Sequence, residues 1–249
     1  MCCFTGVVES VSATRIFARA AEEGRQFLVY SMHYKAKDEL AMVLPLPTPK
    51  KSADDAVKFI NLEKYDDFFS DMEKGFPQPR AAAAVPKGEA PLSKPHLAVI
   101  DVGSFEASFV PTVADFARLD KRFRLPEGTW EKLPGYKQYG FAVFKLKPEK
   151  TNVHPMAFSF PRTKPREIFF PTVHIHDGEV HDTAEFDHVL YVQMSEGSRP
   201  PRGWRESSIP AGMYMDLKRA QGLLEGESHV YKQVLRGKLK NADTLVGTA

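Results

Sequence analysis

Cysteine is scarce in this chain of 249 residues, and its two copies, Cys2 and Cys3, stand side by side in the opening "MCCFTGVVES". Two thiols cannot build a disulfide framework, which excludes the class of small disulfide-rich secreted proteins. The opening also lacks a charged segment followed by an apolar run, and no apolar stretch reaches the ~18 residues that cross a bilayer. We therefore expect a cytoplasmic protein with no membrane partner.

An excess of charge of one sign is also missing. Lys and Arg together number 34, against 32 Asp and Glu, so the formal net charge is only +2. The basic residues form no long block, which argues against a nucleic-acid partner. Walker loops, dinucleotide-binding glycine motifs, G-x-S-x-G elbows and CxxC pairs are absent from the sequence. We expect a small-molecule substrate or a metal ion as the partner; oligomeric state is open.

Apolar material is plentiful, because hydrophobic residues make up 43% of the chain and aromatic residues 11%. Short runs rich in Val, Ile, Phe and Tyr, such as "QFLVYSMHY" and "YGFAVFKL", predict strands with partial alternation. Two stretches, 61–76 and 112–123, carry apolar residues at helical spacing and predict helices. The expected class is α+β, with a mostly antiparallel sheet or sandwich and a few short helices.

One proline-rich segment, "FPQPRAAAAVPKGEAPLSKP" at residues 76–95, interrupts the series of strand-like runs. Five prolines forbid a regular ladder there, and the alanines offer little to pack. Strand-like runs of the same composition lie on both sides of this segment. We therefore expect one domain over residues 1–249, with 76–95 as an excursion on its surface.

Four of the eight histidines fall in "PTVHIHDGEVHDTAEFDHVLYVQ". His174 and His176 are two apart on an expected strand, so their side chains leave the same face. If the chain returns as the strand "FDHVLYVQ", His188 comes back beside them. Imidazole is the commonest metal-ligating side chain, and this arrangement predicts a transition-metal site.

The two thiols strengthen this prediction, because the terminal strand can place Cys2 or Cys3 against the histidine-bearing sheet. A mixed thiolate and imidazole set suits copper or zinc better than iron, and three protein ligands leave a position for substrate. The function expected is metal binding, by a metal-dependent oxidoreductase or hydrolase acting on a small molecule. Three carboxylates are expected to orient the imidazoles: Asp177, Asp182 and Asp187.

Two alternatives remain open. Removal of Met1 leaves Cys2 with a free α-amine beside its thiol, as in an N-terminal nucleophile amidohydrolase, where the thiol attacks a carbonyl and the amine acts as base. The start "MCCFTGVV" resembles that of cysteine amidohydrolases of this class. The other alternative is a metal-handling or structural protein without catalysis.

Two further resemblances concern the architecture. His174 and His176 match the His-x-His of cupin barrels, but the spacing to Glu179 or Glu185 departs from the cupin pattern. The stretch "AMVLPLP", residues 41–47, together with Cys2 and Cys3, resembles a poorly characterised bacterial family with a cysteine-rich start and a Val-Leu-Pro-Val-Pro motif. This resemblance covers the first third of the chain and implies shared architecture without naming a reaction.

Overall fold

The computed structural model describes residues 2–6, 8–77, 100–102, 105–125, 128–146, 154–175, 181–195 and 197–247. Within these ranges strands dominate, and the only α-helix is the seven-residue α1 (Phe68–Lys74). The predicted α+β class is therefore wrong, and the chain folds as a mostly-β sandwich. No helix in this described part is long and apolar enough to cross a membrane.

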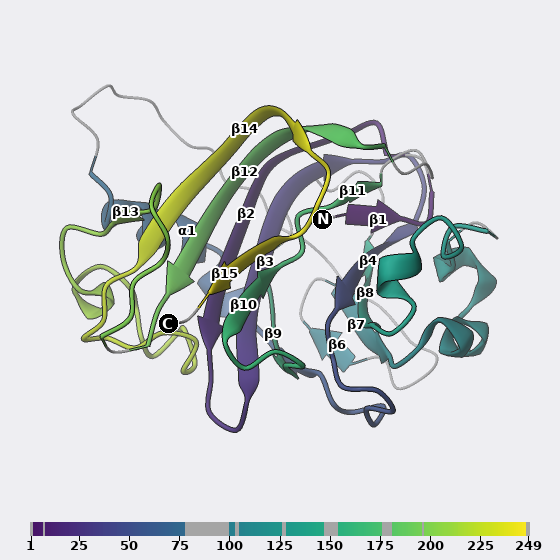
Figure 1. Ribbon diagram of the computed structural model, residues 1–249, viewed down its shortest axis with the longest axis horizontal. Coiled ribbons are helices and arrows are strands. Elements are labelled where there is room, and N and C mark those ends of the chain that lie inside the picture. Colours follow the sequence, from purple (N-terminus) through teal and green to yellow (C-terminus); the bar gives the residue numbers. More distant parts are fainter. Residues whose placement is uncertain are drawn as a thin grey trace.

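The larger layer is a seven-stranded sheet whose long strands curve across Figure 1. Its central strands are buried on both faces: Ile16 and Ala18 contact one core, while Phe17 between them contacts another. Such strands lose the alternation of a half-exposed sheet, which explains the partial alternation in the sequence. In spatial order the strands are β13 (Arg205–Glu206), β14 (Tyr231–Lys240), β12 (Thr183–Gln193), β2 (Ser10–Ala20), β3 (Arg25–Lys35), β9 (Met156–Pro161) and β5 (Lys58–Ile60).

The second layer contains a six-stranded sheet and a two-stranded sheet, which crosses in front of the large sheet in Figure 1. Neighbouring strands run antiparallel throughout the three described sheets except for β1 with β11 and β2 with β12, which are parallel. The six-stranded order is β11 (His174–Ile175), β1 (Cys2–Phe4), β4 (Leu40–Leu46), β8 (Gly140–Leu146), β7 (Phe105–Val110) and β6 (Ile100–Val102), and the pair is β10 (Glu167–Phe170) with β15 (Thr244–Gly247).

Three apolar clusters hold these layers together. The largest lies between them and joins side chains of β2, β3, β9 and β12 to side chains of β4, β8 and β10. A second packs the outer face of the large sheet against α1 and the segment 211–230. A third covers the outer face of the six-stranded sheet with the short 3-10 turns η2 (Val113–Arg118), η3 (Lys121–Phe123) and η4 (Pro134–Tyr136).

The two predicted helices are much shorter than expected. Residues 61–76 form the 3-10 turn η1 (Glu63–Tyr65) followed by α1, and 112–123 form only η2 and η3. The apolar stripes were read correctly in one respect, because Tyr65, Phe68 and Met72 are fully buried. Phe76, the first residue of the predicted surface excursion, is also buried, and residues 78–95 of it lie outside the described residues.

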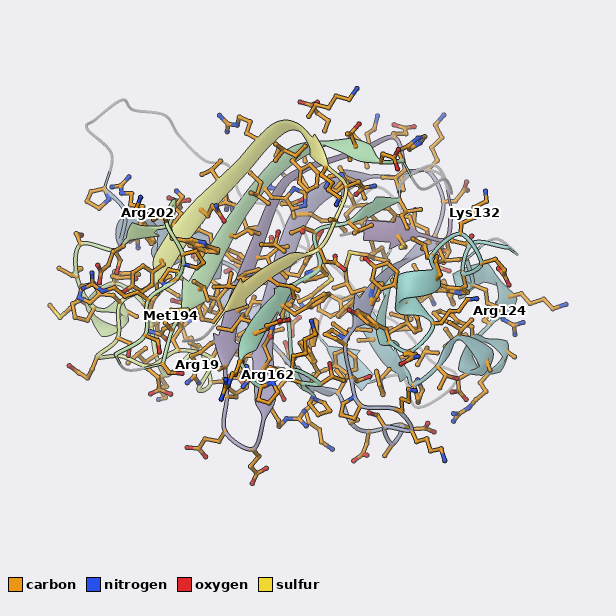
Figure 2. All side chains as sticks on the ribbon, in the orientation of Figure 1. Arg19, Arg124, Lys132, Arg162, Met194 and Arg202 are labelled. Carbon is orange, nitrogen blue, oxygen red and sulfur yellow. The ribbon has the colours of Figure 1, made fainter. Side chains whose placement is uncertain are left out.

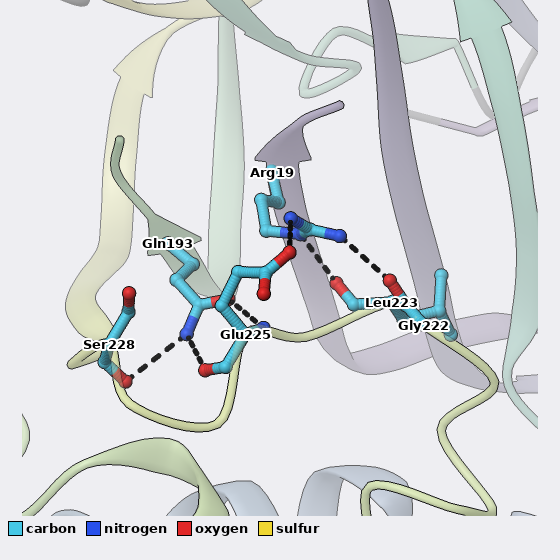
Figure 3. Close-up of polar contacts among 6 residues, drawn as sticks. All are labelled: Arg19, Gln193, Gly222, Leu223, Glu225 and Ser228. Atoms are coloured by element: carbon cyan, nitrogen blue, oxygen red, sulfur yellow. Dashed lines mark hydrogen bonds and ion pairs between the residues drawn. The ribbon is translucent and has the colours of Figure 1, made fainter. Parts of the chain in front are cut away.

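A long loop from Ser207 to Val230 covers one end of the large sheet, and two side chains at the strand ends hold it there. The Arg19 guanidinium donates to the carbonyl oxygens of Leu223 (2.9 Å) and Gly222 (2.7 Å) and pairs with the Glu225 carboxylate. Gln193 donates to the carbonyl oxygen of Glu225 at 2.7 Å and accepts from its N–H at 2.8 Å. Figure 3 shows these side chains filling the space between strand and loop.

Long charged side chains ring the sandwich. In Figure 2, Arg124 and Lys132 lie on the side of the six-stranded sheet, and Arg202 lies on the opposite side of the molecule. Arg124 caps a local turn by donating to the carbonyl oxygens of Leu119 and Ala117. These three cations therefore lie at the periphery of the molecule, outside the core between the two layers.

Candidate functional site

The histidine-rich segment lies where the two layers meet, at the end of the sandwich that holds β1 and β11. His174 on β11 and His188 on β12 face one another, with 3.3 Å between their Nε2 atoms and 4.7 Å between ring centroids. Phe186 packs on both rings, at 4.5 and 5.2 Å. This separation allows a hydrogen bond across the two sheets in which the ring that carries its proton on Nε2 donates to the other.

A bulge in β2 lies beside this pair. The register between β2 and β3 shifts between Ser12 and Arg15, and Ala13 has a φ of +52°. The Asp187 carboxylate accepts from the backbone N–H of Ala13 at 2.8 Å and approaches that of Thr14 at 3.5 Å. Its carboxylate thus satisfies amides that the bulge removes from the ladder.

These side chains border a cavity of about 360 Å³. Its wall combines two imidazoles, two carboxylates, a hydroxyl and apolar surface, so it can both donate and accept hydrogen bonds. The residues lining it are Val11, Thr14, His174, Glu185, Phe186, Asp187 and His188.

The strand that carries His174 is held by side chains as well as by its neighbour β1. The Asn241 side chain accepts from the His174 N–H at 2.7 Å and donates to the His174 carbonyl oxygen at 2.9 Å. It also donates to the carbonyl oxygen of His181 at 3.0 Å. One amide side chain thus takes the place of a strand partner and fixes β11 to the connection between β14 and β15.

Two residues further on, Asp243 continues this attachment. Its carboxylate accepts from the N–H groups of Thr172 and Val173, at 2.9 and 3.1 Å, and from the Tyr136 hydroxyl at 2.6 Å. Burial raises the pKa of Asp243, and the Tyr136 hydrogen bond opposes that shift. Burial and the neighbouring Asp243 charge also raise the pKa of Tyr136. Asn241 and Asp243 were not predicted as site residues, because polar residues after a strand are typical of a turn.

The structure brings some of the predicted site residues together and separates others. Cys2 lies opposite His174 in the parallel pairing of β1 and β11, and Cys3 lies opposite Ile175. Cys3 is fully buried with Ile175 on the outer face of the six-stranded sheet, whereas His174 faces the other layer. The Cys3 thiol therefore points away from the imidazole pair.

Parts of the predicted ligand set lie outside the described residues: His176, Asp177 and the side chain of Cys2. Among the residues that are described, no group of three or more His, Cys, Asp or Glu could hold a metal ion. Asp187 binds backbone amides, and Asp182 is exposed, so the predicted support of the imidazoles by these carboxylates is not seen. Cys2, Cys3, His174, His176 and His188 as ligands, Cys2 as nucleophile, and a copper or zinc cofactor remain untested predictions.

No family model matches the sequence, and no curated protein matches it either. Solved structures do match. The crystal structure of baculovirus P35 has a TM-score of 0.51 at 14% identity, over 98% of this chain and 99% of P35. A mutated baculovirus P35 after caspase cleavage has a TM-score of 0.50 at 17% identity, over 95% and 99% of the chains. The caspase-8/P35 complex gives 0.47 at 15% identity, over 95% and 96%.

At these identities the likeness establishes the fold, which this chain shares with P35 over nearly its whole length. Together with the lack of a metal-holding group among the described residues, it overturns the prediction of a copper or zinc enzyme with a mixed Cys/His centre. The prediction of a small molecule or metal ion as partner is contradicted as well, since the matching mutated P35 was solved after cleavage by a caspase, which is a protein.

The comparisons leave the resemblance to a bacterial family untested. Its motif falls on β4, where Pro45 lies opposite Phe141 of β8. On the other side of β4, β1 reaches only Val43 and Met42. Pro45 therefore stands beyond the end of β1, where its missing N–H breaks no ladder hydrogen bond to that strand.

Proposed function

We propose that this chain is a protease-binding protein whose partner is a cysteine protease, as a caspase is for P35. The observation that carries the proposal is the fold correspondence with P35 over 98% of this chain and 99% of that one. Almost no part of either chain is left unmatched. The likeness therefore favours a shared mode of action over two different proteins that have only one sheet in common. The partner class comes from P35 itself, one matching structure of which is of a mutated P35 after caspase cleavage.

The sequence bears on which protease this is. Caspases cleave after aspartate, and residues 76–95 contain no aspartate, whereas they contain Arg80, Lys87 and Lys94. Exposed loops of small and polar residues are the preferred sites of proteolysis, and 76–95 is the stretch that the sequence predicts to be one. The proposed class of partner therefore includes cysteine proteases that cleave after basic residues. The cytoplasm, predicted from the sequence, is the compartment proposed for this encounter.

The test is a titration of protease activity. Purified chain is added to caspase-8 and, in parallel, to clostripain, a cysteine protease that cleaves after arginine, and hydrolysis of a fluorogenic peptide is followed. We expect at least one of the two activities to fall in proportion to added chain and to vanish near equimolar ratio. Size-exclusion chromatography should show chain and protease eluting together, and intact mass should locate any cleaved bond.

A core variant supplies the control. Phe158→Asp places a charge at a fully buried position between the layers and should unfold the chain. An unfolded chain is only a competing substrate, so it should slow peptide hydrolysis without forming a stable complex. Unchanged activity of both proteases at tenfold excess of chain, or equal effects of wild type and Phe158→Asp, would contradict the proposal.

A further inference from the structure

The outer edge of β14 is largely unpaired within the described part of the chain. On its inner side, Tyr231–Lys240 pairs with β12 along the whole strand. On its outer side, β13 pairs only with Lys232 and Tyr231. Figure 1 shows β14 as the long strand bounding the large sheet, with β13 beside one end only. Eight residues, 233–240, therefore present an open sheet edge, which is a template for another strand.

The side chains along this edge carry charge of one sign. The strand reads "YKQVLRGKLK", with four cations and no acidic residue. Lys232 pairs with Glu73, whereas Arg236, Lys238 and Lys240 are exposed, and no ion pair holds them among the described residues. Apolar surface is exposed as well: Val234, 49% exposed, shares a face with these cations, and Leu239, 37% exposed, lies on the opposite face.

Gly237, in the middle of β14, has open space where a side chain would stand on its face of the sheet. Gly237 has a φ of +86°, and a Cβ built on it would meet nothing within 4 Å. Its neighbours on the strand, Arg236 and Lys238, lie opposite Asp187 and Glu185 of β12. Acidic residues therefore lie across the ladder from two of these cations on the paired side of β14, and opposite charges suit such cross-strand positions.

A second copy of the chain does not fit this edge. Two β14 strands pairing antiparallel through the same edge would place Arg236, Lys238 and Lys240 of one copy opposite cations of the other, which is destabilising. Edge lysines commonly prevent such self-association. The same charges attract a strand of opposite sign, because main-chain hydrogen bonds supply affinity while the side chains select the partner.

We infer that the outer edge of β14 binds an extended acidic segment of another protein, which adds to the large sheet as a further strand next to residues 233–240. The expected segment alternates Asp or Glu with apolar or β-branched residues. Its carboxylates would meet Arg236, Lys238 and Lys240, and its apolar side chains, on the opposite face of the added strand, would cover Leu239. This inference does not rest on the proposed function, since it uses only the pairing and charge of β14.

The probe is a fluorophore-labelled decapeptide, capped at both ends, in which glutamate alternates with valine or threonine, and fluorescence anisotropy reports binding. We expect saturable binding that weakens as NaCl is raised, because exposed ion pairs are screened by salt. The triple variant Arg236→Gln, Lys238→Gln, Lys240→Gln should bind at least tenfold more weakly. The matched control Lys50→Gln, Lys121→Gln, Lys218→Gln, also at exposed positions, should bind as wild type does.

Two more peptides separate strand addition from a general attraction of opposite charges. Each is N-methylated at every second amide, one on the even positions and the other on the odd ones, so that each loses the donors of one edge. Strand addition predicts that one of the two fails to bind and the other binds. Equal binding of both, binding independent of salt, or equal loss in the two triple variants would overturn the inference. Circular dichroism of each variant confirms that the comparison is between folded proteins.

Discussion

At the scale of single residues, polar side chains replace missing strand contacts at the end of the sandwich. Asp187 receives the amides of the β2 bulge, Asn241 pairs with both backbone groups of His174, and Asp243 receives two amides and a hydroxyl. Buried donors left without an acceptor each cost ~1–3 kcal/mol. These three side chains therefore stabilise backbone that the sheets leave incomplete.

Asp243 allows a direct test. We expect Asp243→Ala to lower the free energy of unfolding by roughly 2–4 kcal/mol, because it leaves two buried amides and the Tyr136 hydroxyl without their acceptor. Tyr136→Phe removes only one of the three hydrogen bonds and should cost about 1 kcal/mol. Urea denaturation at neutral pH measures both values. Equal losses in the two variants would show that the amides are satisfied in some other way.

The backbone of Ala13 gives a prediction of opposite sign. An alanine at a φ of +52° is strained by roughly 1 kcal/mol, and glycine adopts this conformation without that strain. We therefore expect Ala13→Gly to raise the thermal midpoint slightly or leave it unchanged. Ala20→Gly, at the end of the same strand, should lower stability by roughly 0.5–1 kcal/mol. A loss at Ala13 as large as that at Ala20 would contradict the assignment of strain.

At the scale of elements, the short helix α1 is attached to the large sheet through one partly buried charge cluster. The Glu73 carboxylate accepts from Lys232 at 2.7 Å and from the Tyr191 hydroxyl, and the Lys232 ammonium also lies over the rings of Phe76 and Tyr191. The side chain of Lys232 is only 12% exposed. Removing its partner leaves a cation with little access to water.

We expect Glu73→Ala to cost roughly 2–3 kcal/mol and to speed hydrogen exchange in α1, because a largely buried charge loses its partner. Replacing both partners, in Glu73→Ala with Lys232→Met, should cost less than the sum of the single changes. The double-mutant cycle measures that difference. Asp55→Ala, which breaks the exposed pair with Lys58, is the control and should cost less than 1 kcal/mol.

The elements also show how far the sequence could be interpreted. Many strands, and the buried stripe of Tyr65, Phe68 and Met72, could be recognised in the sequence, because burial of one face makes apolar residues recur at a regular spacing. The helix after Thr112 was predicted wrongly, since an apolar spacing of three and four fits 3-10 turns packed on a sheet as well as an α-helix. The return of the chain that brings His188 near His174 was predicted from the sequence, but as a hairpin, whereas β11 and β12 lie in different sheets. Asn241 and Asp243 act through contacts across roughly 70 residues, which no local pattern encodes.

At the scale of the whole molecule, tyrosines are spread through the three apolar clusters and respond to pH together. Burial raises the pKa of Tyr34 to about 12. It also raises the pKa of six others: Tyr65, Tyr136, Tyr139, Tyr191, Tyr214 and Tyr231. In the unfolded chain these phenols ionise near pH 10. Their contribution to stability is therefore complete below pH 10 and is lost as pH rises toward the pKa of the folded state.

We expect urea midpoints to change little from pH 8 to 9.5 and to fall steeply from pH 10 to 12. Tyr34→Phe removes one titrating group, so the slope of stability against pH in this window should be shallower than in wild type. The measurement is a set of urea titrations across that range, with tyrosinate absorbance recorded in parallel. A slope unchanged by Tyr34→Phe would mean that Tyr34 ionises alike in both states.

The parallel pairing of β2 with β12 has a consequence for synthesis on the ribosome. β2 and its hairpin partner β3 emerge early, whereas Asp187, which binds the N–H of Ala13, is made 174 residues after it. At roughly 5–20 residues per second, the edge of β2 that later pairs with β12 stays unpaired for about 10–35 seconds after it is made. During that interval the nascent hairpin is a template for pairing with other chains. Slower translation between β3 and β12 should therefore lower the yield of folded protein, and a chaperone that shields β2 should restore it.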